Sequence, residues 1–280
     1  MPVPPAPDFR ARLRSGPPLV LDAAMGTDLL ARGAILPAPL WSAQALLDAP
    51  ELVEAIHREN AEAGADVLTI ASFRLHRRKQ LIEMAVNAAR DGRRAEGVWI
   101  AGSLAPLFDC FRPDLVPKQE NALSSEHAEM AAALAAAGVD LILVETMNTV
   151  REAAAAARGA AATNLPVVVS CVTNGRGRLL SGEPVEDFAR ALLSLRAPPD
   201  ALGINCVAAR SLAGDLARLA AAAPGVPLAA YGNTFSDPVA PQGYADLAAE
   251  WLRLGARLAG GCCGTTAAHT AAVAGLIYGK

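Results

Sequence analysis

Residues 137–147 read Ala-Gly-Val-Asp-Leu-Ile-Leu-Val-Glu-Thr-Met, a sequence that passes from a helix end into an apolar run. Gly138 stands where a helix would stop, because glycine is the residue that most often terminates helices. The apolar run from Asp140 to Met147 has the length and bulk of a buried strand. Since Ala-Gly-Ala-Asp at 63–66 precedes another such run, we interpret both as helix-to-strand turns of a βα protein.

The same alternation continues along the chain. Leu52, Val53 and Ile56 recur at helical spacing after Pro50, and the alanine-rich segments 131–137 and 153–157 favour helices. Between the helical patterns lie eight predicted strands: 19–24, 66–72, 98–104, 140–147, 167–173, 201–206, 227–233 and 256–263. Eight is the strand number of a (β/α)₈ barrel, a fold of about 250 residues.

We therefore predict an α/β protein with a single-domain (β/α)₈ TIM barrel over residues 19–280. Residues 1–18, which are rich in proline, are predicted to be a loose lead-in without the pattern of a signal peptide. The alternative fold is a doubly wound open sheet, because the number of strands does not show whether the sheet closes.

Composition narrows the class of partner. The 280 residues carry a net charge of −3 and are 52% hydrophobic, which excludes a disordered chain and permits a large core. Basic residues are scattered, and no apolar run approaches the roughly 20 residues that span a bilayer. We expect a protein that acts on small molecules, with neither a nucleic-acid nor a membrane partner. The sequence does not indicate an oligomeric state. Five cysteines, two of them adjacent, indicate reduced thiols and a cytoplasmic location.

Three of these cysteines stand at strand ends. Cys206 ends the sixth predicted strand, and Cys262 and Cys263 end the eighth, with only one strand between them around a barrel. Because the carboxyl ends of barrel strands carry the functional groups, we expect the three thiols to meet there. Three cysteines with an open fourth position are a ligand set for Zn²⁺ that binds a substrate. Glycines at 260, 261 and 264 give the backbone the freedom to turn both adjacent sulfurs inward.

The charge of such a site favours one kind of reaction. Zn²⁺ with three thiolates has a formal charge of −1, so it activates water poorly. A thiol that entered the fourth position would lose its proton and remain nucleophilic, which suits alkyl transfer to sulfur. Alternatively, the three cysteines are small buried residues or a vicinal disulfide, or the glycine-rich turn before Thr265 and Thr266 binds phosphate.

Seven short motifs between residues 19 and 266 form a family pattern. They are Asp22-Ala-Ala-Met-Gly-Thr27, Leu40-Trp-Ser-Ala43, His57 through Ala-Gly-Ala-Asp66, Ala101-Gly-Ser103, Glu145-Thr-Met147, Gly203-Ile-Asn-Cys206 and Gly260-Gly-Cys-Cys-Gly-Thr265. In these motifs the chain resembles the homocysteine S-methyltransferases, a family that includes betaine–homocysteine methyltransferase and the homocysteine-binding module of cobalamin-dependent methionine synthase.

The resemblance implies roles for individual residues. It implies a barrel with zinc on Cys206, Cys262 and Cys263, and homocysteine sulfur as a further ligand. Glu145 matches the carboxylate that holds the homocysteine amino group, and the turn of Asp22, Ala23 and Ala24 matches the one beside its carboxylate. Alternatively, Asp22 and Glu145 are structural acids. Asn205 is a candidate for orienting either a cysteine or the substrate. The alternative is that its side chain caps a loop.

Three stretches depart from the family pattern. Ala23 and Ala24 replace two glycines, the second strand ends in Thr-Ile-Ala-Ser-Phe-Arg at 69–74, and the loop 105–114 lacks the usual Gly-Pro continuation. The basic cluster of Arg74, Arg77, Arg78 and Lys79 is interpreted as a solvated face, with contact of Arg74 to an anionic donor group as the alternative. Phe108 and Phe111 are interpreted as covering the core, with the shelter of a cation as the alternative. Cys110 and Cys171 are interpreted as buried spacers. The four histidines, His57, His76, His127 and His269, form no pair with metal-ligand spacing.

We therefore predict a zinc-dependent methyltransferase that moves a methyl group to the thiol of homocysteine and gives methionine. The donor is a sulfonium such as S-methylmethionine or S-adenosylmethionine, since folate or cobalamin would need domains beyond a 280-residue barrel. The alternatives are a methyltransferase for another thiol or a selenol, and a non-catalytic zinc- or amino-acid-binding barrel.

Overall fold

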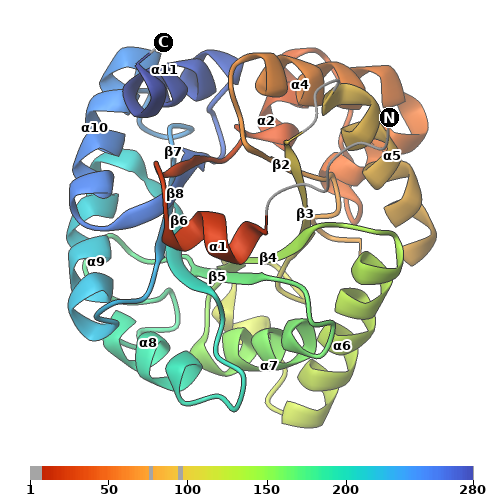
Figure 1. Cartoon of the computed structure of the whole chain (residues 1–280). Helices are drawn as coiled ribbons and strands as arrows, with labels where there is room; N and C mark the ends of the chain where they lie inside the picture. Colours follow the sequence, from red (N-terminus) through yellow and green to blue (C-terminus); the bar gives the residue numbers. More distant parts are fainter. Residues whose placement is uncertain (1–7, 76–77, 94–96, 280) are drawn as a thin grey trace.

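The computed structural model describes residues 8–75, 78–93 and 97–279. Eight parallel strands form one sheet, and helices surround it in chain order (Figure 1). The strands are β1 Leu19–Val20, β2 Val67–Thr69, β3 Trp99–Leu104, β4 Leu141–Met147, β5 Val167–Cys171, β6 Ala201–Ala208, β7 Leu228–Asn233 and β8 Ala256–Gly261. Each lies within or close to its predicted range.

The sheet closes between its first two strands. Leu21 and Val67 form a parallel bridge, the Asp22 amide donates to the Val67 carbonyl at 3.0 Å, and the Asp66 amide donates to the Val20 carbonyl at 2.8 Å. Since β1 also pairs with β8, the strands form a ring. The predicted (β/α)₈ barrel is confirmed, and the open doubly wound sheet is wrong.

Helices follow the strands around the outside. The longer ones are α4 Pro50–Glu62, α5 Ile82–Arg93, α6 Glu120–Ala136, α7 Val150–Ala161, α8 Val185–Leu193, α9 Ala209–Ala222, α10 Pro241–Arg253 and α11 Ala267–Tyr278. Val53 and Ile56 of α4 are fully buried, as the helical spacing predicted. Small residues let α6 and α7 approach closely: a Cβ atom on Gly159 would lie 2.8 Å from the Ala128 nitrogen.

Shorter helices complete the chain: α1 Phe9–Arg14, α2 Met25–Ala31, α3 Ala45–Asp48 and the 3₁₀ turns Trp41–Gln44, Lys79–Leu81 and Pro113–Leu115. The interpretation of residues 1–18 as a loose lead-in is wrong for α1, which lies across one end of the barrel (Figure 1). Phe9 is only 3% exposed and packs edge-on against Trp99, with ring centroids 5.6 Å apart. Arg10 forms an ion pair with Asp200 at 2.9 Å. Residues 1–7 lie outside the described part of the chain.

Helix α1 covers the end of the barrel opposite the carboxyl ends of the strands. The interior is filled by apolar side chains from alternating strand positions, among them Leu19, Leu141, Val168 and Leu258. The carboxyl ends are therefore the open end of the barrel. Within the described ranges, none of the helices is long and apolar enough to cross a lipid bilayer.

Candidate functional site

Three cysteines meet at the carboxyl ends of the strands. Cys206 lies in β6, and Cys262 and Cys263 follow β8 directly. Their Sγ atoms all lie within 4.8 Å of one another, and those of Cys206 and Cys263 are 3.9 Å apart. The structure thus brings together the three residues that the sequence predicted to converge, and we call them the cysteine cluster. All three are free thiols, and no vicinal disulfide joins Cys262 to Cys263.

Irregular backbone aims these side chains at one point. Cys206 has a φ of +53°, in the left-handed region that non-glycine residues rarely enter. The pairing of β6 with β7 shifts register between Asn205 and Ala208, as it does at a β-bulge. Gly264, with a φ of +85°, turns the chain after the adjacent pair. Strain of this kind persists where the surrounding structure enforces it, often at functional sites.

The end of β7 holds both halves of the cluster. Asn233 Nδ2 donates a hydrogen bond to the Cys206 carbonyl at 2.7 Å, and the Thr234 amide donates to the Cys263 carbonyl at 2.8 Å. The buried Tyr244 hydroxyl lies 2.8 Å from each of the Gly232 and Gly260 carbonyls, one on β7 and one on β8. These contacts fix the backbone of the cluster without using its sulfur atoms.

The cluster has the spacing and charge of a metal-ion site. Tetrahedral zinc with sulfur at about 2.3 Å would separate its ligands by about 3.8 Å, close to the 3.9 Å between Cys206 and Cys263. Hydrogen bonds from Cys206 and then Cys262 lower the pKa of Cys263 to about 3, so one thiolate is already favoured. A hydrogen bond with Cys206 raises the pKa of Cys262, whose deprotonation therefore needs a cation. The donor set fits a thiophilic divalent ion.

The cluster lines a pocket of about 440 Å³ at the open end of the barrel. This volume suits a small molecule rather than a polymer. Its walls come from β2, β3, β4, β6, β7 and β8, from the residues that follow β1, and from the loops after several of these strands. Besides the cluster, its polar and aromatic side chains include Asp22, Thr69, Arg74, Ser103, Asp109, Cys110, Glu145, Tyr231, Trp41, Phe73 and Phe111.

Glu145 reaches this pocket from the end of β4. The Ser103 hydroxyl donates to its Oε1 at 2.5 Å. Burial raises the pKa of Glu145 to about 7, and the hydrogen bond from Ser103 opposes the rise. A carboxyl group balanced near neutrality ionises readily when a cation approaches, so Glu145 is suited to receive an ammonium group.

Asp22 lies opposite, just beyond β1, and is 5% exposed. Its two carboxylate oxygens accept hydrogen bonds from the Thr69 amide at 2.7 Å and the Thr69 hydroxyl at 2.9 Å. Burial raises the pKa of Asp22 to about 8, and the nearby Glu145 contributes to the rise. The two acids therefore share the pocket without both being charged at neutral pH.

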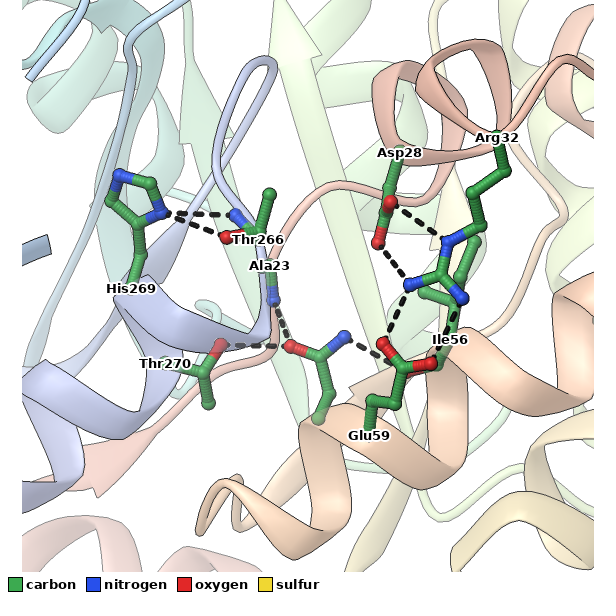
Figure 2. Close-up of polar contacts among 9 residues, drawn as sticks. Ala23, Asp28, Arg32, Ile56, Glu59, Thr266, His269 and Thr270 are labelled. Atoms are coloured by element: carbon green, nitrogen blue, oxygen red, sulfur yellow. Dashed lines mark hydrogen bonds and ion pairs between the residues drawn. The ribbon is translucent and has the colours of Figure 1, made fainter. Parts of the chain in front are cut away.

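The amide groups of the turn at Ala23 and Ala24 are already paired. The Ala23 amide donates to Asn60 Oδ1 at 3.0 Å, and this oxygen also accepts from the Thr270 hydroxyl at 2.8 Å (Figure 2). The Ala24 amide donates to Thr265 Oγ1 at 3.3 Å. These two amides are thus occupied within the protein, while both residues line the pocket, and the place of this turn beside a substrate carboxylate stays a prediction.

Asn205 is fully buried and is not among the pocket-lining residues. Its Oδ1 accepts from the Thr146 amide at 2.9 Å, and its Nδ2 donates to the Thr146 hydroxyl at 2.8 Å. Asn205, which directly precedes Cys206, is thus bonded to Thr146, which directly follows Glu145. This placement suits the orienting of a cysteine, and a contact of Asn205 with the substrate stays a prediction.

The backbone amides that would bind a phosphate in the turn after β8 are already hydrogen-bonded within the protein. The Gly264 amide donates to the Thr27 hydroxyl at 2.8 Å, the Thr265 amide to the Cys262 carbonyl at 3.0 Å, and the Thr266 amide to His269 Nδ1 at 3.1 Å. A phosphate cradle needs such amides free.

The three described histidines, His57, His127 and His269, are not among the residues that line the pocket. His57 is buried in α4 with neither ring nitrogen hydrogen-bonded, and burial lowers its pKa to about 4. His127 contacts Glu152 at 3.3 Å, and His269 caps α11 (Figure 2). His76 and Arg77 lie outside the described residues.

Sequence reasoning missed one thiol of the pocket. Cys110, interpreted as a spacer, is 5% exposed and lines the pocket with the cluster. Burial raises its pKa to about 11, so it remains a neutral thiol. It lies in the loop after β3, six residues beyond the strand end, and therefore gave no strand-end signal. Cys171 is fully buried in β5, as a spacer would be.

Fold and site together define a class, a (β/α)₈ barrel enzyme whose cysteine cluster can hold a metal ion beside two pocket acids. A family model described as homocysteine S-methyltransferase matches residues 19–277. The chain belongs to the homocysteine S-methyltransferase family and is a methyltransferase.

Individual relatives agree. The chain is 32% identical to the homocysteine S-methyltransferase of Escherichia coli (strain K12), over 95% of this chain and 97% of the relative. It is 24% identical to the selenocysteine Se-methyltransferase of Brassica oleracea var. italica, over 88% of this chain and 85% of the relative. Among solved structures, it resembles the metallated form of the homocysteine methyltransferase MmuM from Escherichia coli, with a TM-score of 0.82 and 31% identity, over 95% of this chain and 99% of that chain.

Proposed function

We propose that this enzyme transfers a methyl group from a sulfonium donor to the thiol of homocysteine, giving methionine, with zinc at the cysteine cluster. The observation that carries the proposal is the convergence of Cys206, Cys262 and Cys263 in one pocket with Glu145. The names of the relatives support homocysteine as acceptor, and the metallated form of MmuM supports a metal.

Zinc is the metal we assign, because three thiolates with a vacant position form a zinc ligand set. When bound, zinc would lower the pKa of an incoming thiol and keep its sulfur nucleophilic. With three thiolates the site has a formal charge of −1, which disfavours water activation and leaves thiol alkylation as the chemistry that fits. The need for reduced cysteines supports a cytoplasmic location.

The acids orient the acceptor in this proposal. Glu145 receives the homocysteine ammonium, and its pKa of about 7 lets it ionise as the cation arrives. Asp22 has a pKa of about 8 and is held by Thr69 at both oxygens, so at neutral pH it is mostly protonated and leaves Glu145 as the carboxylate that receives the ammonium. Because the Ala23 and Ala24 amides are engaged, we place the substrate carboxylate beside this turn through other groups of its wall, rather than through those two N–H donors.

The reaction balances without a general base. The thiol proton is released to solvent on binding, and the resulting thiolate sulfur attacks the methyl carbon of the sulfonium. The new carbon–sulfur bond forms as the old one breaks, and the bonding electron pair stays on the donor sulfur, giving two neutral thioethers. Catalysis then depends on holding sulfur, methyl carbon and leaving sulfur nearly collinear.

A selenol is the second candidate acceptor. The 24% identity to a selenocysteine Se-methyltransferase favours it, and the same cluster would bind a selenolate. Parallel assays with homocysteine and selenocysteine at equal concentration distinguish the two acceptors by their kcat/KM values.

The experiment for the proposed function uses purified protein loaded with one equivalent of Zn²⁺. Incubation with homocysteine and either S-methylmethionine or S-adenosylmethionine is expected to yield methionine, and Cys206→Ser is expected to lose both the metal and the activity. Glu120→Gln, at an exposed residue of α6 that pairs with Arg158, serves as a control. Bound zinc without methionine from either donor would contradict the proposal and leave a binding protein.

A further inference from the structure

One cationic side chain lines the pocket, whose other titratable side chains are acids, thiols and a tyrosine. Among the described residues that line the pocket, Arg74 is the only lysine or arginine. Its Nη2 lies 3.8 Å from Asp109 Oδ1, and the two side chains are 31% and 45% exposed. They come from different loops, Arg74 after β2 and Asp109 after β3. In addition to Asp22 and Glu145, the pocket therefore presents one positive and one negative group side by side.

The backbone at Arg74 is shaped for a different residue. The Leu75 amide donates to the Ser72 carbonyl at 3.0 Å, which closes a turn with Arg74 at its third position. Arg74 has a φ of +70° there, a conformation for which glycine is the usual residue. An arginine in this conformation costs about 1–2 kcal/mol relative to an unstrained backbone. The guanidinium is thus held in the pocket wall despite a local cost.

The loop that carries Asp109 is hydrogen-bonded to Asn148, which lies between β4 and α7, and to Glu152 of α7. Asn148 Nδ2 donates to the carbonyls of Asp109 and Cys110, at 3.3 and 3.0 Å. Glu152, fully buried in α7, accepts from the Leu107 amide at 2.8 Å. Asp109 Oδ1 also accepts from the Phe111 amide at 2.9 Å. The loop that carries Asp109 is therefore anchored, and the pair with Arg74 has a defined place.

An ion pair this long is a weak stabiliser. Exposed pairs contribute about 0–1 kcal/mol, and at 3.8 Å Arg74 and Asp109 do not share a close hydrogen bond. Both groups consequently retain capacity for other partners. A guanidinium receives a carboxylate through two parallel hydrogen bonds, and a carboxylate receives an ammonium. The two charges lie next to each other, as do the carboxylate and ammonium of an α-amino acid.

We infer that Arg74 and Asp109 form a second amino-acid subsite, which binds the carboxylate and the ammonium of a donor that is itself an α-amino-acid sulfonium. This inference rests on the proposed function, because it assigns the donor side of the same pocket. The sulfonium centre of such a donor is attracted to the electron-rich cluster. The pair selects donors by their amino-acid end and distinguishes them from simple alkyl sulfonium ions.

The test measures donor binding separately from turnover. Calorimetry on the zinc-loaded enzyme compares S-methylmethionine, which has both groups, with dimethylsulfoniopropionate, which lacks the ammonium, and trimethylsulfonium, which lacks both. Arg74→Gln is expected to lower the affinity for S-methylmethionine and dimethylsulfoniopropionate by about tenfold or more, because it removes a charge-assisted hydrogen-bond donor to their carboxylates. The affinity for trimethylsulfonium is expected to stay unchanged. Asp109→Asn is expected to weaken only S-methylmethionine.

Control measurements distinguish a general disturbance of the fold from the specific loss of donor binding. Arg112→Gln removes an exposed ion pair with Asp114 in the same loop, outside the residues that line the pocket, and is expected to change no donor affinity. Zinc content and homocysteine KM are expected to stay at wild-type values in Arg74→Gln and Asp109→Asn.

The outcomes separate this inference from the proposed function. Equal weakening of all three donors, unchanged S-methylmethionine affinity in both variants, or no wild-type binding of S-methylmethionine would each overturn the subsite. Wild-type binding with the expected variant pattern but without methionine formation would uphold the subsite and refute the proposed function.

Discussion

Asn205 and Thr146 exchange two hydrogen bonds across the barrel mouth, and each residue is the chain neighbour of a pocket residue. Thr146 follows Glu145, and Asn205 precedes Cys206. Both Thr146 and Cys206 have positive φ, +60° and +53°, so the contact joins two irregular strand segments. It couples the position of the acid to the position of one sulfur.

Replacing Asn205 therefore tests this coupling. Asn205→Ala leaves the Thr146 amide and hydroxyl unpaired in a buried place, which is expected to lower the free energy of unfolding by about 2–3 kcal/mol. Zinc affinity is expected to fall about tenfold or more, as when other residues that support metal ligands are removed.

The matched variant is Thr146→Val. It keeps the hydrogen bond from the backbone amide of residue 146 to Asn205 Oδ1 and loses only the one that the Thr146 hydroxyl accepts from Asn205 Nδ2. Its effects on chemical denaturation and on competition with a zinc chelator are expected to be smaller. An Asn205→Ala protein with wild-type zinc affinity would show that the contact does not position Cys206.

Gly264 offers a second test of the backbone that aims the cluster. A Cβ atom there would lie 2.7 Å from both the Phe235 nitrogen and Thr234 Oγ1, at a φ of +85°. Gly182 has nearly the same φ, +92°, but a Cβ atom added to it would meet no other atom within 4 Å. Gly182→Ala consequently incurs only the conformational cost of about 1 kcal/mol, whereas Gly264→Ala adds a collision with the β7 end.

We expect Gly264→Ala to lose at least about 1 kcal/mol more stability than Gly182→Ala and to purify with less than one equivalent of zinc. Urea denaturation and metal analysis of the two variants provide the comparison. Equal stability and equal zinc content in both would mean that the loop after β8 shifts without cost.

The raised pKa of Glu145 predicts how ligand affinity depends on pH. Burial moves this carboxyl from its ordinary value of 4.5 to about 7, so below pH 7 it holds a proton that an incoming ammonium must displace. The dissociation constant of L-methionine is therefore expected to fall by up to about tenfold per pH unit from pH 5 to 7 and to level off above it.

Glu145→Gln is expected to bind L-methionine weakly and with little pH dependence over the same range. The unliganded wild-type protein is also expected to lose stability as pH rises from 4.5 to about 7, because in this range the Glu145 carboxyl is ionised in the unfolded chain but stays protonated in the folded one. Calorimetric titrations at several pH values measure the affinity, and a profile that is flat for the wild type would contradict the assigned role of Glu145.

The barrel and the cysteine cluster were predictable because both follow from local patterns. Apolar runs alternate with helical spacing, and Cys206, Cys262 and Cys263 stand at or next to strand ends, which a parallel barrel brings together. The fate of the Ala23 amide was not predictable in this way. Its partner Asn60 lies 37 residues away in α4, and only the packing of α4 and α11 around β1 brings the two into contact.

Two other differences have the same origin. Phe9 and Leu13 are spaced as one turn of helix, but the short segment is stable only because Trp99 and the barrel interior receive it. Arg74 and Asp109 lie 35 positions apart, and their meeting depends on the lengths of two irregular loops, for which no periodic pattern exists.

The central claim is that three sulfur atoms hold a metal ion and leave one position for the acceptor. X-ray absorption at the zinc edge, recorded on the loaded enzyme before and after addition of homocysteine, measures the number of sulfur ligands directly. The account predicts three sulfur neighbours at about 2.3 Å in the resting enzyme and four in the complex. A sulfur count that does not change on addition of homocysteine, at a concentration where homocysteine is shown to bind, would contradict it.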